Sequence, residues 1–350
     1  MAKRASTRRN LVGLEIEPSG IAAVEVTVNG AIAVERAAIA PLEAGIVRDG
    51  EVTDVEGLAE ALRTLYRENK GLDKRVRIGV ANQKIVVRLL ELPPIANEKE
   101  LDAAVRFSAQ DQIPMPLDSA VLDFHPLDVV ETAAGPRQRV VVVAARRDMI
   151  DKVLAAARAA GLRPEGVDLA AFAMVRALHR LGGPGEAVLY LSIGGLTNLA
   201  VARGATCLFT RVVGGGLESM AIELAERRGL TLEHARGWLL HVGLDRPVEE
   251  IDGDEEVVAD ARTVLMDGAR RIAQDARNSL DFHDAQDDTS GVERAVVTGP
   301  AIAVAGFAEA LSTELGLPVD AGALEGTPPG IDAGRLTIAA GLAIEEAPGT

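Results

Sequence analysis

LVGLEIEPSGIAAVEVTVNGAIAVERAAI, residues 11–39, contains three apolar runs separated by two turns. The first run, Leu11 to Ile16, precedes a Ser-Gly turn, and the runs 21–28 and 31–39 flank Asn29-Gly30. Asn-Gly between two alternating runs is the strongest short signal for a β-hairpin. We therefore predict three consecutive strands at the start of the chain.

The same pattern returns near the middle of the sequence. An apolar run at 188–193 leads into Gly194-Gly195, and runs at 198–203 and 206–210 flank Gly204. Ile16 and Ile193 are 177 positions apart, and Gly30 and Gly204 are 174 apart. Because this offset is nearly constant and close to half the chain, the sequence predicts a duplicated unit and two related lobes.

Helical periodicity fills the segments between these strands, as in Leu58, Leu62 and Leu65, and in Leu265, Ala269 and Ile272. Strands that alternate with such helices indicate an α/β fold. We expect a flexible tail at 1–10, lobe one at 11–186 and lobe two at 187–346, with an outer subdomain at about 214–285.

A proline-punctuated block interrupts the first lobe. It carries Pro93-Pro94 and the pair Pro114 and Pro116, and it reads as strand, helix, strand, strand, helix. We predict a small α+β subdomain inserted into lobe one at about 92–165.

Composition excludes several classes of protein. The 350 residues carry 37 Lys and Arg against 52 Asp and Glu, a net charge of −15, and aromatic residues make up 3%. A negative chain with few aromatic rings is a poor nucleic-acid partner.

No run approaches the roughly 18 apolar residues of a membrane span. A lone Cys207 excludes a disulfide framework and fits a cytoplasmic protein. Glu15 and Glu17 interrupt any export signal after the basic start.

Two lobes that each present a small-residue turn after a strand can hold a phosphate chain between them through backbone N–H groups. The candidate residues from these turns are Ser19, Gly20, Ser192, Gly194, Gly195, Thr197, Thr298 and Gly299. The alternative is that the turns merely connect strands.

Several segments together resemble the PilM family of type IV pilus assembly proteins, which are actin-like and related to FtsA. They are the opening LVGLEIEPSGIAAVEV, the block LLELPPIANEKELDAAVRFSAQDQIPMPLDSAVLDFHPL at 89–127, LSIGGLTNLAVARG, LFTRVVGGG, ARNSLDFHDAQ, AVVTGPA and LTIAAGLAIE. The resemblance covers about residues 10–346 and implies an actin-like, RNase H-like fold. The inserted block separates FtsA and PilM from actin, sugar kinases and Hsp70. The end GLAIEEAPGT lacks the amphipathic helix of FtsA, which favours PilM.

The nucleotide loops depart from the pattern of this family. Glu15 keeps a carboxylate in place of the usual aspartate, whereas Glu17 would repel phosphate and Pro18 removes a backbone N–H. Ala22 stands where the family has a lysine, and Ser192 replaces an aspartate. We expect no catalytic residue and no required cofactor, with ATP and Mg²⁺ bound weakly at most. Gly215 and Gly216 match the hinge of the family and complete the nucleotide-binding candidates.

The resemblance implies an adaptor at the cytoplasmic side of the inner membrane. Such a protein binds the N-terminal cytoplasmic peptide of PilN in a groove between lobe one and the inserted subdomain, and is peripheral to the membrane through partners that include PilO, PilC and the assembly ATPase. We take Val86, Arg88, Leu90 and Leu92 as candidate groove residues, with ordinary core packing as the alternative. A different reading is an active ATPase that remodels the complex or polymerises, as FtsA-like proteins do.

Two acidic segments suggest metal sites at first sight. His283 is close in sequence to Asp281, Asp284, Asp287 and Asp288, and the stretch 248–260 is rich in carboxylates. Neither has the regular ligand spacing of a known metal motif. We interpret both as solvated surface and predict no metal site.

Overall fold

The computed structural model describes residues 11–28, 31–133, 135–181, 185–285, 291–324, 327 and 331–344. The tail at 1–10, the Asn29-Gly30 turn, Asp287, Asp288 and residues 345–346 of the expected second lobe lie outside this part of the chain. The chain forms two compact units, one of residues 1–81 with 156–350 and one of residues 82–155.

The first five-stranded sheet of the larger unit is built around β1 (Val12–Glu17). On one side β1 pairs antiparallel with β2, which pairs antiparallel with β3, and on the other it pairs parallel with β6, which pairs parallel with β10. The bounds of these partners are β2 (Gly20–Val28), β3 (Ile32–Pro41), β6 (Arg75–Val80) and β10 (Arg163–Leu169). Also in this lobe are the short pair β4 (Val47–Arg48) and β5 (Glu51–Val52), and helix α1 (Val55–Glu68).

The second sheet repeats this topology around β11 (Ala187–Ile193). β11 pairs antiparallel with β12, which pairs antiparallel with β13, and parallel with β14, which pairs parallel with β15. These strands are β12 (Thr197–Arg203), β13 (Thr206–Val213), β14 (Arg294–Thr298) and β15 (Val319–Ala321). The matching order of the two sheets confirms the predicted duplication and the two-lobed α/β fold.

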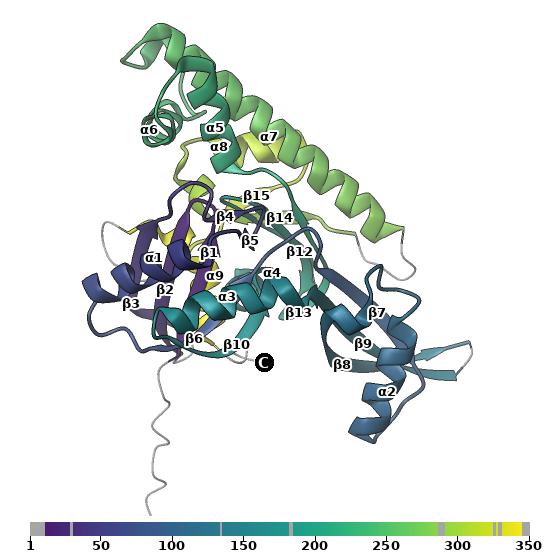
Figure 1. Cartoon of the computed structure of the whole chain (residues 1–350). Helices are drawn as coiled ribbons and strands as arrows, with labels where there is room; N and C mark the ends of the chain where they lie inside the picture. The colour runs from purple at the N-terminus through teal and green to yellow at the C-terminus, as the bar shows by residue number, and fades with distance from the viewer. Residues whose placement is uncertain are drawn as a thin grey trace, which may run out of the picture. The chain divides into compact units, whose positions relative to one another are not determined.

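Two alanine-rich helices connect the sheets (Figure 1). Helix α9 (Thr337–Ala343) lies against β1 and β2, α4 (Ala170–Leu178) lies against β12 and β13, and the two helices contact each other. A Cβ atom on Gly13 would overlap the carbonyl oxygen of Ala339, and one on Gly341 would overlap that of Ala173. Glycine is therefore needed at both positions for the helices to approach this closely.

The outer part of lobe two is helical. It contains α5 (Leu217–Arg228), α6 (Leu232–Val242) and the long α7 (Glu255–Asp284), which cover the expected outer segment and share a core with β11, β12, β14 and α8 (Phe307–Leu315). The short 3₁₀ helices in the larger unit are η2 (His179–Leu181), η3 (Val248–Glu250), η4 (Pro300–Ala303) and η5 (Ala333–Leu336).

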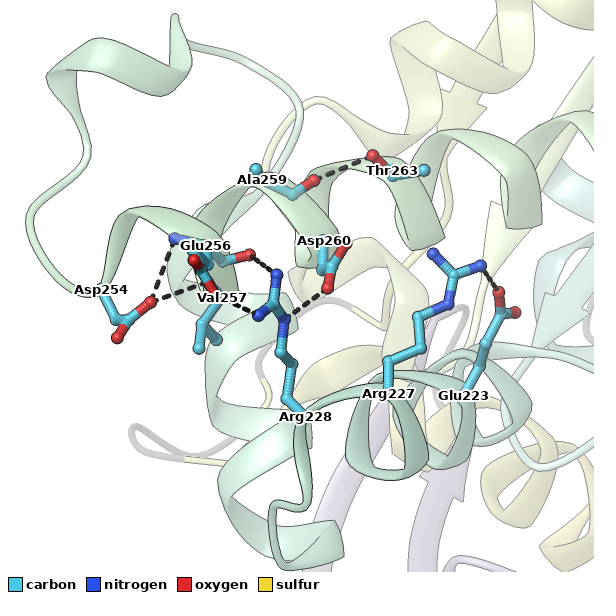
Figure 2. Close-up of polar contacts among 9 residues, drawn as sticks. All are labelled: Glu223, Arg227, Arg228, Asp254, Glu256, Val257, Ala259, Asp260 and Thr263. Atoms are coloured by element: carbon cyan, nitrogen blue, oxygen red, sulfur yellow. Dashed lines mark hydrogen bonds and ion pairs between the residues drawn. The ribbon is translucent and has the colours of Figure 1, made fainter.

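One arginine connects the end of α5 to the beginning of α7, as Figure 2 shows. Arg228 forms ion pairs with Asp260 and with Glu256, the latter at 2.6 Å, and also donates to the Glu256 carbonyl at 3.0 Å. Asp254 caps α7 by accepting from the backbone N–H groups of Glu256 and Val257, each at 3.0 Å. Part of the acidic stretch 248–260 thus has a structural role that the solvated-loop interpretation did not include.

The smaller unit is a three-stranded antiparallel sheet with one helix on it. The strands run in the order β7-β9-β8, with bounds β7 (Val86–Leu92), β9 (Gly135–Arg146) and β8 (Ala120–Thr132). Helix α2 (Glu98–Ala109), capped by Asn97, packs Leu101 and Val105 onto the sheet. The unit also holds η1 (Leu117–Ser119) and the start of α3 (Arg147–Ala159).

This unit spans 82–155, whereas the sequence predicted about 92–165. The difference comes from strand pairing. β7 pairs with β9 and so belongs to the smaller sheet, while β10 pairs with β6 in the first sheet of the larger unit.

Candidate functional site

Two glutamates stand side by side at the end of β1. Glu15 pairs with Ala22 of β2 and Glu17 pairs with Gly20, so the turn between the strands contains only Pro18 and Ser19. Side chains two residues apart on a strand point to the same face. Glu15 and Glu17 therefore project together into the cleft between the lobes.

A narrow cavity of about 10 Å³ lies in this cleft, which is room for about one water molecule. It brings together the three predicted loops with the segment η5. Its lining residues are Glu15, Glu17, Gly20, Ala22, Ser192, Gly299, Pro300, Gly334 and Arg335.

The second loop faces the first across the cleft. The Gly195 backbone N–H donates a hydrogen bond to Glu17 Oε2 at 3.2 Å, while the Gly194 N–H is used within its own turn, donating to the Leu196 carbonyl at 3.0 Å. A Cβ atom on Gly195 would lie 2.8 Å from Pro18 Cδ. The two loops are thus in direct contact.

The hinge glycines Gly215 and Gly216 contact the second loop. Thr197 Oγ1 donates to the Gly215 carbonyl at 3.0 Å, and a Cβ atom on Gly216 would overlap the Gly194 carbonyl oxygen. Neither Gly215 nor Gly216 is among the residues that line the cavity. The lack of a side chain at Gly216 allows the turn between β11 and β12 to approach the start of α5 closely.

The third loop follows β14. Gly299 has a φ of +84°, which favours glycine, and it lines the cavity. Thr298, by contrast, is fully buried and its hydroxyl shares a 2.8 Å hydrogen bond with that of Thr337 in α9. Thr298 thus connects β14 to α9 rather than facing the cavity.

Arg335 is the residue that sequence reasoning missed. It lies in η5, where Asp332 caps the turn by accepting from the Gly334 N–H at 2.9 Å. Its Nη2 lies 2.9 Å from the place where a Cβ atom of Gly20 would stand, so the guanidinium covers the first loop. The only sequence signal was a single arginine in a stretch of small apolar residues.

The acids in this cleft are hard to ionise. Burial raises the pKa of Glu15 well above its ordinary value, and the neighbouring Glu17 raises it further while Arg335 lowers it. Burial also raises the pKa of Glu17. The Gly195 N–H and Arg335 lower that pKa, Glu218 raises it, and the nearby Ser19 hydroxyl lowers it, although this hydroxyl makes no well-formed hydrogen bond to any residue that the structure describes.

The residues present do not fit a magnesium triphosphate. Two carboxylates and one guanidinium share the cavity, Pro18 has no N–H to donate, and about 10 Å³ does not hold a phosphate group. Ser192, which replaces the expected aspartate, lines the cavity with a neutral hydroxyl. Among the described residues, no group of three or more His, Cys, Asp or Glu side chains is placed to hold a metal ion.

The candidate groove residues of β7 divide between core and surface. Leu90 and Leu92 are buried in the core of the smaller unit, Val86 packs against the same core, and Arg88 is exposed. Leu90 and Leu92 therefore offer no surface to a peptide. The opposite face of β7 carries Leu89, which is 42% exposed.

His283 is buried rather than solvated, in contrast to the expectation for this helix end. It is 3% exposed, and its ring packs against Phe209 with the ring centroids 5.9 Å apart. Burial lowers its pKa, Asp284 raises it and Arg203 lowers it. Neither ring nitrogen has a hydrogen-bond partner among the described residues.

Comparison with known proteins identifies the family. The model for the type IV pilus assembly protein PilM matches residues 13–322, which is most of the chain. This chain belongs to the PilM family. A solved PilM–PilN type IV pilus biogenesis complex matches with a TM-score of 0.79 and 28% identity, covering 96% of this chain and 98% of that chain.

More distant structures share the actin-like fold of the PilM family. The ethanolamine utilization protein EutJ from Carboxydothermus hydrogenoformans has a TM-score of 0.53 and 17% identity, covering 97% of this chain and 90% of that one. MreB 5 of Spiroplasma citri bound to AMPPNP has a TM-score of 0.52 and 11% identity, covering 96% and 95%. At these identities the likeness concerns the fold alone.

In the described residues we find no helix with the length and apolar character needed to span a bilayer.

Proposed function

We propose that this chain is an actin-like adaptor of the type IV pilus inner-membrane assembly complex, acting on the cytoplasmic side. The observation that carries the proposal is the PilM family match over 13–322, together with the 96% coverage by a PilM–PilN complex at a TM-score of 0.79. In this proposal the partner is the N-terminal cytoplasmic peptide of a PilN-like membrane protein, which holds the adaptor at the inner membrane.

The smaller unit offers a surface suited to an extended peptide. Because strand residues alternate between faces, Val87 and Leu89 of β7 and Val141 and Val143 of β9 lie on the face opposite α2. Leu89 is exposed and the three valines are half-buried. Among the described strands β7 pairs only with β9, so its other edge can form backbone hydrogen bonds with an added strand.

Peptide binding tests this proposal. Fluorescence polarisation with labelled N-terminal peptides of single-span proteins encoded beside this chain should give saturable binding with a Kd below about 1 mM. Leu89→Asp should weaken binding by at least about tenfold, because it places a charge on the apolar face.

Phe107→Asp is the matched control. Phe107 is 74% exposed and lies on α2, which covers the other face of the same sheet. It should leave binding unchanged. Failure of every peptide to bind, or equal loss in both variants, would refute the proposed surface.

In this proposal the cleft does not turn over ATP. Glu15 and Glu17 would repel a phosphate chain in this cavity, and Ser192 supplies no carboxylate for a metal. Steady phosphate release from ATP and Mg²⁺ that Glu15→Ala abolishes would instead support the FtsA-like ATPase. PilO-like and PilC-like proteins and the assembly ATPase remain further partners in the proposal.

A further inference from the structure

The Glu17 carboxylate lies against the second loop in the way a bound oxyanion would. The Gly195 N–H donates to Oε2 at 3.2 Å. A Cβ atom on Gly194 would overlap Oε2 and lie 2.9 Å from Oε1, so both carboxylate oxygens rest on this backbone. Only glycine at position 194 permits this contact.

A positive charge stands in the same cavity. Arg335 lines the cavity together with Glu17. The guanidinium favours the ionised form of Glu17, as does the Gly195 N–H. The first loop has no positively charged residue of its own, and Arg335 of η5 places a positive charge beside it.

The cavity leaves no room for a second anion beside Glu17. Its volume of about 10 Å³ corresponds to about one water molecule. An anion of the size of phosphate could therefore enter only if the Glu17 side chain were absent or displaced.

We infer that the Gly195 backbone N–H and Arg335 form an oxyanion site, which Gly194 leaves open by having no side chain, that this chain fills this site with its own Glu17, and that the vacated site takes inorganic phosphate. Glu17 is the last residue of β1, and only Pro18 and Ser19 separate it from β2, so it competes with free anions as an intramolecular ligand. Because the cavity beside the Glu17 side chain has room for only about one water molecule, free phosphate is excluded from the wild-type protein. The inference does not depend on the pilus role.

Chemical rescue tests the inference. Thermal unfolding is measured at pH 6.5 with 0 to 20 mM phosphate, at an ionic strength held constant with NaCl. Glu17→Ala should be stabilised by phosphate, with Tm rising by about 2 °C or more, because a ligand that binds only the folded state stabilises it. Wild-type Tm should not respond, and Glu17→Ala combined with Arg335→Met should lose the response.

Glu15→Ala is the matched control. It removes a carboxylate from the same cavity, but the Gly195 N–H donates to Glu17. Its Tm should not respond to phosphate. No rescue of Glu17→Ala, or equal rescue of both single variants, would overturn the inference.

A second measurement covers the case in which Glu17→Ala does not fold. The Gly195 amide of the wild-type protein, followed by NMR, should shift as the pH is lowered and Glu17 gains a proton. An amide that shows no such titration would overturn the proposed carboxylate contact.

Discussion

Replacing Glu15 with glutamine should stabilise the protein at high pH and leave its stability unchanged at low pH. Glutamine keeps the shape of the protonated acid but cannot ionise. Burial and the neighbouring Glu17 both disfavour the charge of Glu15, and Arg335 only partly offsets them. The variant therefore removes an unfavourable charge wherever the wild-type residue is ionised.

The magnitude follows from the strand geometry. Glu15 and Glu17 are two residues apart on β1, which places them about 6.6 Å apart along the strand. At an effective dielectric constant near 20, two like charges at this distance repel by about 2.5 kcal/mol. Losing the attraction to Arg335 cancels part of this gain, so we expect a net stabilisation of about 1–2 kcal/mol at pH 9.

The sign of the pH dependence follows from proton binding. Because the folded-state pKa of Glu15 is raised, the folded protein holds a proton that the unfolded chain releases once the pH exceeds the ordinary value of 4.5. The contribution of Glu15 to wild-type stability therefore falls as pH rises from 4.5 through the raised pKa. Glutamine does not titrate, so the stability of Glu15→Gln does not fall in this way as the pH rises.

Thermal unfolding of both proteins between pH 5 and pH 9 measures the difference. The Tm of Glu15→Gln should match that of wild type at pH 5 and exceed it by roughly 1–3 °C at pH 9. Glu43→Gln makes the same change of net charge at an exposed loop position and should show no pH-dependent difference. A difference curve for Glu15→Gln that is flat with pH, or a variant less stable at pH 9, would refute the reasoning.

Three further outcomes are expected. Burial raises the pKa of the Cys207 thiol to about 12, which lowers the fraction of reactive thiolate at pH 8. Ellman's reagent should therefore react on the order of a thousandfold more slowly with the folded protein than with the urea-unfolded protein. Equal rates would contradict this. Arg228→Ala should reduce hydrogen-exchange protection in the first turns of α7, whereas Arg227→Ala, whose partner Glu223 lies on α5 itself, should not. In urea unfolding, Gly13→Ala should destabilise the protein by about 1–3 kcal/mol, because the added Cβ atom clashes with α9. Gly237→Ala has open space around it in helix α6 and should stabilise the protein by up to about 1 kcal/mol. A Gly13→Ala protein as stable as wild type would show that α9 can shift.

The strands and their duplication could be predicted because their signals are local. Asn29-Gly30 and Gly194-Gly195 mark turns within a few residues of the runs that they connect, and the near-constant offset between the two patterns follows from simple counting. The matching order of the two sheets then follows from the duplication.

The boundaries and faces of the inserted unit depended on pairings that the sequence does not reveal. The run from Val86 to Leu92 is apolar on both faces, so a two-residue period could not tell that α2 covers Leu90 and Leu92 and leaves Leu89 exposed. The pairing of β10 with β6 joins segments almost ninety positions apart.

In the cleft, too, contacts between segments far apart in the sequence could not be predicted. The sequence indicated that Glu17 and Pro18 are unusual in a phosphate loop, and this could be argued from charge alone. Two contacts gave no signal of their own. Arg335 reaches the first loop from the end of the chain, and Gly195 donates to a carboxylate 178 positions away.

The placement of α9 has a consequence for synthesis of the protein. Gly13 of β1 packs against Ala339 of α9, and α9 also contacts α4. As the chain leaves the ribosome, β1 and β2 are made well before α9, so the apolar face that α9 covers stays open until residues 337–343 have been made. The nascent polypeptide therefore carries an unfinished core between the synthesis of β1 and that of α9, and a chaperone that shields this face would protect it during that interval.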